Sequence, residues 1–192
     1  MSWQRIAKAP NFPQRVTSDR LVLRPYRHGD ADDLFSYAND EEWSRYITPP
    51  YPYRRDYAKK FIEERINGHG NEWAGWCIDY GDQMVGSIDL ILDATHRSAD
   101  LAYSLAQEHW YKGLMTEAVG ATIDAAFSID RPLNRFFARI DTRDDASARV
   151  AKKLGLIQEG VLRQSRFHKG KFIDNAIFVI LRDNWKMTVL LS

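Results

Sequence analysis

The sequence predicts a single domain of mixed α/β (α+β) class, in which helices cover both faces of a mostly antiparallel sheet of six or seven strands. Three observations lead to this class. The chain has 192 residues, a length that fits one domain with a full core. Helix-like and strand-like segments interleave, and several strands follow one another across a tight turn. Hydrophobic residues make up 44% and charged residues 28%, as is ordinary for a soluble globular protein.

The first third of the chain predicts one strand and two helices. Residues 20–26 carry apolar side chains on both faces, as a buried strand does. Residues 28–40 predict a helix, and Asp30 is placed to cap its N-terminus. After a proline-rich loop, a second helix is predicted over 56–66, because its apolar residues recur close to a 3.6-residue period.

The middle of the chain predicts three strands and a helix. Residues 73–80 and 83–92 read as strands, and the Gly-Asp pair between them is a tight hairpin signal. Residues 100–106 read as a further strand. A helix is predicted over 115–127, whose apolar residues share one face.

The last part predicts three strands and a short helix. Residues 135–141 form the first of these strands. A short helix follows, capped by Asp144 or Asp145 and ended by a glycine. Residues 156–164 and 172–181 read as two long strands joined by a turn.

Charge and composition argue against several classes of partner. The formal net charge of +1 gives no reason to expect nucleic acid or an anionic membrane as the main partner. The single cysteine, Cys77, excludes an internal disulfide and is interpreted as a small buried hydrophobe in a reducing compartment. No metal site is expected, because the histidines are scattered without metal-ligand spacing: His28, His69, His96, His109 and His168.

The two ends of the chain are interpreted as extensions of one domain. No segment approaches the roughly 18 apolar residues of a membrane span. Residues 1–17 lack the apolar run of a signal peptide, so we expect a cytoplasmic extension that packs through Trp3 and Phe12. The domain itself is assigned to residues 18–187, and residues 188–192 to a tail.

The segment "EHWYKGLMTEA" (residues 108–118) has the features of a phosphate-binding turn. A strand that runs through a glycine into a helix leaves backbone N–H groups unpaired at the positive end of the helix dipole. Gly113 allows close approach, Lys112 adds a charge and Thr116 a hydroxyl. The alternative is an ordinary loop leading into a helix, and this segment alone does not decide between the two.

Four segments in order resemble the GNAT superfamily of acyl-CoA-dependent N-acetyltransferases, and most closely its RimJ/RimL group. They are "RLVLRPY", "AYSL…HWYKGLMTEA", "DASARVAKKLGLIQEGVLR" and "KGKFIDNAIFVILRDNW", and the resemblance covers about Ser18 to Trp185. The resemblance implies a fold with a splayed central strand pair. It also implies direct transfer of an acetyl group from acetyl-CoA to a primary amine, either a protein N-terminus or a small molecule. A homodimer is compatible with it.

The resemblance implies where acetyl-CoA binds. The loop around Gly113 would hold the pyrophosphate through its N–H groups, and the strand near Ser104 would pair with pantetheine. A backbone N–H of Ser104 or Leu105 would polarise the thioester carbonyl, as in an oxyanion hole. The implied cofactor-binding residues are Ser104, Leu105, Ala106, Trp110, Lys112, Gly113, Leu114, Met115, Thr116, Asp144 and Ser147.

Four residues depart from the family pattern. Asp144 stands where asparagine is usual, and a carboxylate cannot donate the hydrogen bond of an amide. Met115 replaces a small residue and would narrow the loop, Ser104 replaces a tryptophan and would widen the cleft, and Leu156 replaces a phenylalanine. Asp144 keeps a second hypothesis open, namely a non-catalytic acyl-CoA sensor. A nucleic-acid-binding domain, the third hypothesis, is disfavoured by the near-neutral charge.

Acetyl transfer needs a base for the amine and an acid for the leaving thiolate. Asp89 and Asp100 are the candidate bases; the alternatives are a salt bridge for Asp89 and a solvated strand end for Asp100. Ser147 is the candidate acid and Tyr103 its rival, and packing alone would also explain either residue. An aromatic region is expected to pack the first helices and to contribute to the acceptor slot: Trp43, Tyr46, Tyr51, Tyr53 and Trp73. The basic run at residues 163–171 is interpreted as a solvated hairpin that could contact an acidic acceptor or partner.

Overall fold

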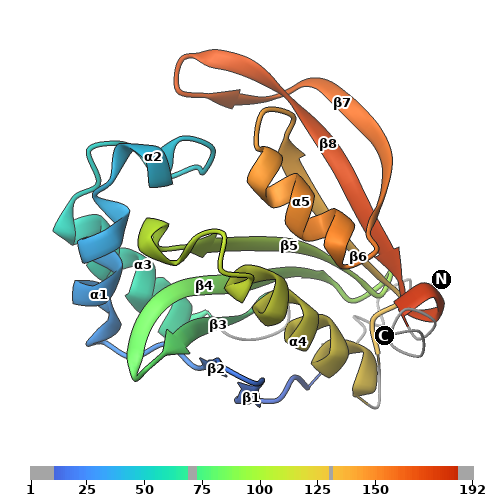
Figure 1. The fold of residues 1–192 in the computed structure, drawn as a ribbon, viewed down its shortest axis with the longest axis horizontal. Helices are drawn as coiled ribbons and strands as arrows, with labels where there is room; N and C mark the ends of the chain where they lie inside the picture. The colour runs from blue at the N-terminus through green and yellow to red at the C-terminus, as the bar shows by residue number, and fades with distance from the viewer. Residues whose placement is uncertain (1–10, 69–72, 130–131, 186–192) are drawn as a thin grey trace, which may run out of the picture.

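The computed structural model describes residues 11–68, 73–129 and 132–185, and its centre is an eight-stranded sheet (Figure 1). The strand order is β1-β2-β3-β4-β5-β6-β8-β7. Every neighbouring pair is antiparallel except β5 and β6, which are parallel. The strands are β1 (Val16–Thr17), β2 (Val22–Arg24), β3 (Trp73–Tyr80), β4 (Gln83–Asp93), β5 (Ser98–Leu105), β6 (Arg135–Asp141), β7 (Ile157–His168) and β8 (Lys171–Leu181).

Helices cover both faces of this sheet, as the sequence predicts. The helices α1, α2 and α3 pack with β3 and β4 in one hydrophobic cluster, while α4 and α5 pack in another against the central strands. The helical segments are α1 (Asp30–Ala38), α2 (Glu41–Ser44), α3 (Arg55–Asn67), the 3-10 turn η1 (Gln107–His109), α4 (Leu114–Ser128) and α5 (Asp145–Lys153).

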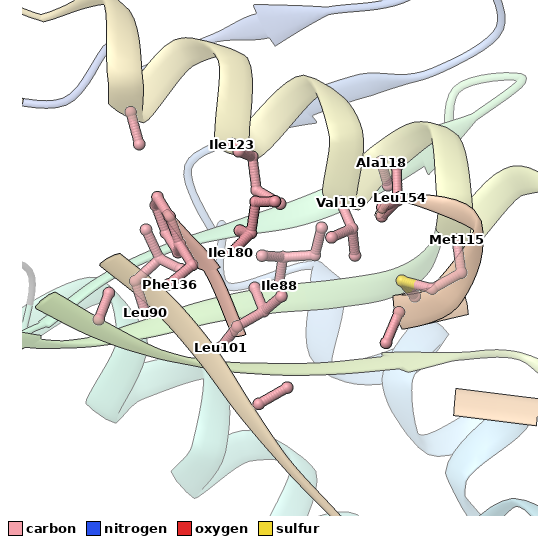
Figure 2. Close-up of a cluster of buried hydrophobic side chains, with 14 of the residues drawn as sticks. Ile88, Leu90, Leu101, Met115, Ala118, Val119, Ile123, Phe136, Leu154 and Ile180 are labelled. Atoms are coloured by element: carbon pink, nitrogen blue, oxygen red, sulfur yellow. The ribbon is translucent and has the colours of Figure 1, made fainter. Parts of the chain in front are cut away.

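The larger cluster fills the space between α4 and the sheet (Figure 2). Met115, Val119 and Ile123 of α4 point down onto Ile88 of β4 and Leu101 of β5. These α4 residues recur at intervals of four, so they share one helical face. The packing sets the position of the first turn of α4, the turn that the sequence assigns to phosphate binding.

The alternation of side chains along β4 and β5 separates this core from a polar surface. On β4, Ile88 and Leu90 face α4, so Ser87 and Asp89 lie on the opposite face. On β5, Asp100 lies on that same face, because Leu101 belongs to the α4 side. A helix-covered face of a sheet ordinarily buries apolar residues. The polar residues Ser87, Asp89 and Asp100 on this face therefore indicate a functional site and not a packing surface.

Three local features differ from the sequence predictions. The two-residue strand β1 and the four-residue helix α2 are too short to give a periodic signal. Asp30 does not cap α1: Gly29 is the N-cap and no side chain caps the helix. The Asp30 carboxylate is buried and accepts hydrogen bonds of 2.9 and 2.8 Å from the guanidinium of Arg24, which lies on β2. This ion pair overrides the local capping preference.

The described part of the N-terminal extension joins the domain. Phe12 is buried and meets Trp76 edge-on with ring centroids 5.9 Å apart, and β1 pairs with β2. Trp3 lies outside the described residues, as does His69. The tail assigned to residues 188–192 does too.

Candidate active site

The parallel strands β5 and β6 separate part-way along their length. They are paired only at Ser98–Asp100 with Arg135–Phe137. Beyond this point β5 stays paired with β4 and β6 stays paired with β8. The sheet therefore opens into a V, and the edge of β5 that faces β6 has no strand partner after Asp100. This confirms the splayed strand pair that the family resemblance implies.

The register of β5 decides which residue offers a free N–H in the V. The Ala106 N–H donates to Val85 O on β4 at 2.8 Å. Because main-chain groups alternate along a strand, the N–H of Ser104 points to β4 as well, and that of Leu105 points into the V. The Leu105 carbonyl accepts from Trp110 Nε1 at 2.8 Å, which fits this orientation. Of the two candidates, Ser104 and Leu105, only Leu105 is thus placed to donate to a ligand in the gap.

Ala106 is not available for a ligand, in contrast to the sequence-based assignment. Its N–H is taken by Val85, and its carbonyl accepts from the His109 N–H at 3.0 Å. The second bond belongs to η1, which turns the chain after β5. This short turn has no sequence period, which is why the free edge was extended one residue too far.

The turn before α4 has the backbone conformation of an anion-binding site. Gly113 is the N-cap of α4 with φ 78°, in the left-handed region that favours glycine. Leu114, Met115 and Thr116 form the first turn, whose N–H groups have no partner within the helix. A 15-residue helix directs its positive dipole end at this turn. The Met115 side chain is buried in the core of Figure 2.

Two residues of the connection between β1 and β2, Ser18 and Arg20, hold this turn in place. Glu117 accepts from the Ser18 hydroxyl at 2.7 Å and from the Arg20 N–H at 2.8 Å. The Arg20 Nε donates to the same carboxylate at 2.7 Å, and its Nη1 donates to Lys112 O at 3.1 Å. Burial opposes ionisation, but these hydrogen bonds together lower the pKa of Glu117. The Lys112 side chain is exposed and does not line the cavity described next.

A cavity of about 450 Å³ lies between this turn, the end of β5 and α5. It holds most of the cofactor-binding residues that the sequence suggests: Ser104, Leu105, Trp110, Gly113, Leu114, Met115, Thr116, Asp144 and Ser147.

The same cavity has cationic residues that sequence reasoning missed. Arg149 and Lys153 of α5 line it together with Arg143, which precedes the helix. Arg149 and Lys153 are four residues apart, so they lie on one helical face. The four-residue spacing is visible in the sequence, but only the fold shows that this face of α5 lines the same cavity as the turn at Gly113.

Asp144 caps α5, as one of the two sequence alternatives proposed. Its carboxylate accepts the Ser147 N–H at 3.0 Å. This contact explains why an aspartate serves where asparagine is usual: the capping role needs only an acceptor.

A second cavity of about 880 Å³ lies on the polar face of β4 and β5, under the helices α2 and α3. Both Asp89 and Asp100 line it, as do Arg65 and Arg139. It adjoins the first cavity, because seven residues line both: Trp43, Tyr46, Ile47, Tyr103, Ser104, Asp144 and Ser147.

Asp89 is held by two donors. Its Oδ1 accepts from Tyr26 Oη at 3.1 Å and its Oδ2 from Arg65 Nε at 3.0 Å. The residue is 8% exposed, and burial raises the pKa of its carboxyl group despite Arg65. The salt-bridge alternative for Asp89 is therefore present, and it ties α3 to the sheet.

Asp100 is bound on one oxygen only. Nε and Nη2 of Arg139 both donate to Oδ2, the former at 2.9 Å, while Oδ1 has no partner among the described residues. Asp100 is 8% exposed, so it is not the solvated strand end of the sequence alternative. Burial raises the pKa of this carboxyl group, and Arg139 opposes the rise. Asp100 also occupies the last paired position before the V opens.

The two candidate acids meet at the boundary between the cavities. Tyr103 Oη donates to the main-chain carbonyl of Ser147 at 3.3 Å. Burial raises the pKa of this phenol. The Ser147 hydroxyl makes no hydrogen bond to another described residue, so its proton remains available.

The aromatic residues divide between packing and lining. Trp43 and Tyr53 are buried in the cluster of α1–α3 and also line the second cavity. Tyr46 lines both cavities, Trp73 packs against the cluster, and Tyr51 is exposed and lines neither. The expectation that most of them pack the helices is thus largely met.

The basic run at residues 163–171 is partly anchored, not simply solvated. Lys169 Nζ donates to Ser44 O at 2.7 Å, and Arg166 donates to the hydroxyl of Thr48. The β7–β8 hairpin thereby reaches α2 and the loop after it, as Figure 1 shows from its orange-red arm toward the blue helices.

Comparison with known proteins identifies this arrangement. Residues 20–157 match the model of the acetyltransferase (GNAT) domain. The chain belongs to the GNAT family of acetyltransferases. It is 30% identical over 174 residues to the uncharacterised N-acetyltransferase p20 of Bacillus licheniformis, with 88% of this chain and 97% of p20 covered.

Solved GNAT acetyltransferases share the fold. Mycobacterium smegmatis RimJ, in complex with a CoA-disulfide, has a TM-score of 0.80 and 19% identity, covering 91% of this chain and 90% of RimJ. The microcin C7 self-immunity acetyltransferase MccE, in complex with acetyl-CoA and AMP, has a TM-score of 0.78 and 20% identity, covering 85% and 93%. The RimJ/RimL resemblance is confirmed at the level of the fold.

This GNAT protein is an acetyl-CoA-dependent N-acetyltransferase that transfers an acetyl group to an amine. The comparisons give no support to the non-catalytic sensor. No group of three or more metal-ligating side chains that could hold an ion occurs within residues 11–68, 73–129 and 132–185. Over those ranges, no helix combines the length and apolarity that crossing a bilayer requires.

Proposed function

We propose that acetyl transfer takes place where the two cavities meet, with acetyl-CoA in the smaller one and the amine in the larger one. The single observation that carries this proposal is the set of side chains that line both cavities, among them Ser104 and Ser147. A thioester that lies in the V of β5 and β6 ends at this boundary. An amine in the second cavity would approach it from the polar face of the sheet.

The cofactor would be held by main-chain and cationic groups. The N–H groups at the start of α4 suit the pyrophosphate. Arg149 and Lys153 on α5 suit further phosphate oxygens, because they line the same cavity. Leu105 N–H, directed into the V, would donate to the thioester oxygen as negative charge develops there.

Asp100 is the better candidate for the base, and Asp89 for a positioning residue. Both oxygens of Asp89 already accept hydrogen bonds, whereas Oδ1 of Asp100 is free among the described residues. Asp100 would take a proton from the ammonium group, and the amine nitrogen would then attack the carbonyl carbon. A carboxyl group whose pKa is raised by burial is a stronger base than an ordinary aspartate.

Ser147 would protonate the leaving group. The tetrahedral intermediate loses its remaining extra nitrogen proton to solvent and collapses by breaking the carbon–sulfur bond. The thiolate of CoA then takes the hydroxyl proton of Ser147, which solvent replaces. Tyr103 is the weaker candidate, because its hydroxyl is engaged with the Ser147 carbonyl and its pKa is raised. The products are an N-acetylated amine and CoA.

The test is a thiol-release assay with acetyl-CoA and a panel of amines, in the wild type and in Asp100→Asn. We expect release that depends on the amine, and a loss of about 10²–10⁴-fold in kcat for the variant. Normal turnover of Asp100→Asn at every pH would show that the proton goes elsewhere. Asp89→Asn is the comparison, and it should lower stability more than turnover.

Two further expectations concern the setting of the reaction. The protein is proposed to act in the cytoplasm, where its lone thiol, Cys77, stays reduced; this residue is buried. A homodimer is proposed through the edge strand β7, which exposes Ile157, Val161 and Leu162. Light scattering of the purified chain would distinguish a dimer from a monomer.

A further inference from the structure

We infer that the tip of the β7–β8 hairpin fixes one wall of the amine cavity, and that His168 and Lys169 are the positioning residues that do so. They act through residues 44–50, which we name the strap. This inference rests on the proposed function, because it takes the larger cavity to be the place of the amine. Three observations carry it: the strap lines both cavities, it has no main-chain hydrogen bonds after its first turn, and a strained lysine holds it.

The strap forms a wall that both cavities share. Tyr46 and Ile47 line the smaller and the larger cavity, whereas Thr48, Pro49 and Pro50 line the larger one only. The strap therefore lies where the proposed function has the thioester meet the amine. A displacement of the strap would change the shape of the reaction site from one side.

The strap cannot hold this position by its own backbone. It begins at the last residue of α2 and then runs toward α3 without helix or strand. Among the described residues, no main-chain group of residues 46–50 is hydrogen-bonded to another main-chain group. Only its beginning is anchored by α2, where Trp43 meets Tyr37 and Tyr53 edge-on with ring centroids 5.7 and 5.9 Å away. Side chains from other elements must hold the rest.

The hairpin tip supplies such side chains. Lys169 Nζ donates to the carbonyl and the hydroxyl of Ser44, at 2.7 and 2.9 Å. His168 Nε2 donates to the carbonyl of Arg45 at 3.0 Å, since a carbonyl can only accept. Ser44 is fully buried and His168 is 5% exposed, so water competes little for these bonds. Two of the three acceptors are main-chain carbonyls, and the hairpin therefore holds the backbone of the strap.

Two further contacts cross the same gap. The guanidinium of Arg166 on β7 donates to the hydroxyl of Thr48, and that of Arg143 lies over the Tyr46 ring, 5.8 Å from its centroid. The strap thus joins the two arms of the V. One arm is β1–β5, on which α1–α3 pack, and the other is β6–β8, whose hairpin reaches toward α2 in Figure 1.

The backbone of Lys169 supports a role for its side chain. The turn between β7 and β8 consists of Lys169 and Gly170, with φ 45° and 84°. Turns with positive φ at both central residues favour Asn-Gly or Asp-Gly, because a longer side chain in the left-handed region costs folding free energy. Strain of this kind is found where a residue has a function. The two bonds from Lys169 Nζ to Ser44 are a function that asparagine, with its shorter side chain, cannot supply.

The first experiment measures whether the hairpin holds the strap. Lys169→Asn removes the ammonium donor and gives the turn the Asn-Gly pair that it favours, so the variant should unfold at or above the wild-type temperature. Trypsin should nevertheless cleave the strap after Arg45 about 10- to 100-fold faster, because the strap opens more often. His168→Phe should also speed this cut. Lys171→Gln removes a positive charge from the same hairpin at an exposed position and should leave the rate unchanged. An unchanged rate in Lys169→Asn would overturn the inference.

The second experiment measures whether the strap shapes the amine cavity. A conjugate of CoA and tyramine, joined through an acetyl bridge, would occupy both cavities, whereas CoA occupies only the smaller one. The ratio of their dissociation constants in calorimetry reports the larger cavity. Lys169→Asn should lower this ratio by about tenfold or more and leave the CoA constant nearly unchanged, because the phosphates bind at α4 and α5. Lys169→Arg keeps a cationic donor and should retain most of the ratio.

The outcomes separate this inference from the proposed function. If the conjugate binds the wild type no more tightly than CoA does, the proposed reaction centre is wrong, while faster cleavage after Arg45 would still support the hold of the hairpin on the strap. If the wild type prefers the conjugate and Lys169→Asn keeps the full preference, the proposed function stands and the inference is wrong.

Discussion

The substitution Gly113→Ala, which adds one methyl group, tests whether the turn before α4 binds phosphate. Gly113 has φ 78°, and a Cβ added there would meet only Arg20 Nη2, at 3.6 Å. Gly113→Ala is therefore not excluded by space, and its cost to the free protein is the left-handed backbone alone. That cost is about 1–2 kcal/mol of unfolding free energy.

Gly170 provides a matched control for this cost. It has φ 84° in the β7–β8 turn, and a Cβ there would meet nothing within 4 Å. Gly170→Ala should therefore lose the same stability as Gly113→Ala. Only at Gly113 does the new methyl stand beside the N–H groups that would face the pyrophosphate.

The assay is calorimetric titration with CoA alongside thermal unfolding. We expect both variants to unfold earlier by similar amounts, and only Gly113→Ala to lose CoA affinity, by at least about tenfold or 1.4 kcal/mol. Gly113→Val should lose more. If Gly113→Ala binds CoA as tightly as Gly170→Ala does, the turn does not hold the phosphates and the reasoning is refuted.

Three further predictions concern side chains of the site. Ser147→Ala should lower kcat by about 10²–10⁴-fold with CoA affinity unchanged, and Tyr103→Phe should change kcat little; the reverse result would exchange their roles. Arg149→Ala with Lys153→Ala should weaken CoA binding measured by calorimetry by about 1.5–3 kcal/mol per lost charged contact, and Lys112→Ala by much less. Glu117→Gln should cost about 1.5 kcal/mol at pH 7, because the folded protein lowers the pKa of Glu117. In chemical unfolding, this difference from wild type should shrink as pH falls from the ordinary glutamate pKa through the lower folded-state pKa, where the carboxylate becomes protonated. A difference that persists once Glu117 is protonated would contradict the prediction.

The features that sequence predicted well are those encoded locally. Gly113 before a helical period, and Asp144 three residues before the N–H that it caps, both act within one turn of chain. The separation of β5 from β6 could be predicted only because four segments resemble the GNAT family in the same order. No sequence pattern within β5 or β6 alone shows where these two strands, which are distant in sequence, separate.

What sequence could not predict depends on contacts between distant segments. Asp30 looks like a cap until Arg24 is brought against it by β2. Ala106 looks like a free strand residue until its N–H is seen to reach Val85.

The central claim is that the acetyl group meets the amine where the two cavities join. The most direct measurement is a crystal structure of the protein with a conjugate of CoA and tyramine joined through an acetyl bridge. The account predicts pantetheine in the V of β5 and β6, the bridge carbonyl at the Leu105 N–H, and the tyramine ring in the cavity that Asp100 lines. A conjugate whose amine half lies outside that cavity, or whose carbonyl has no contact with Leu105, would contradict it.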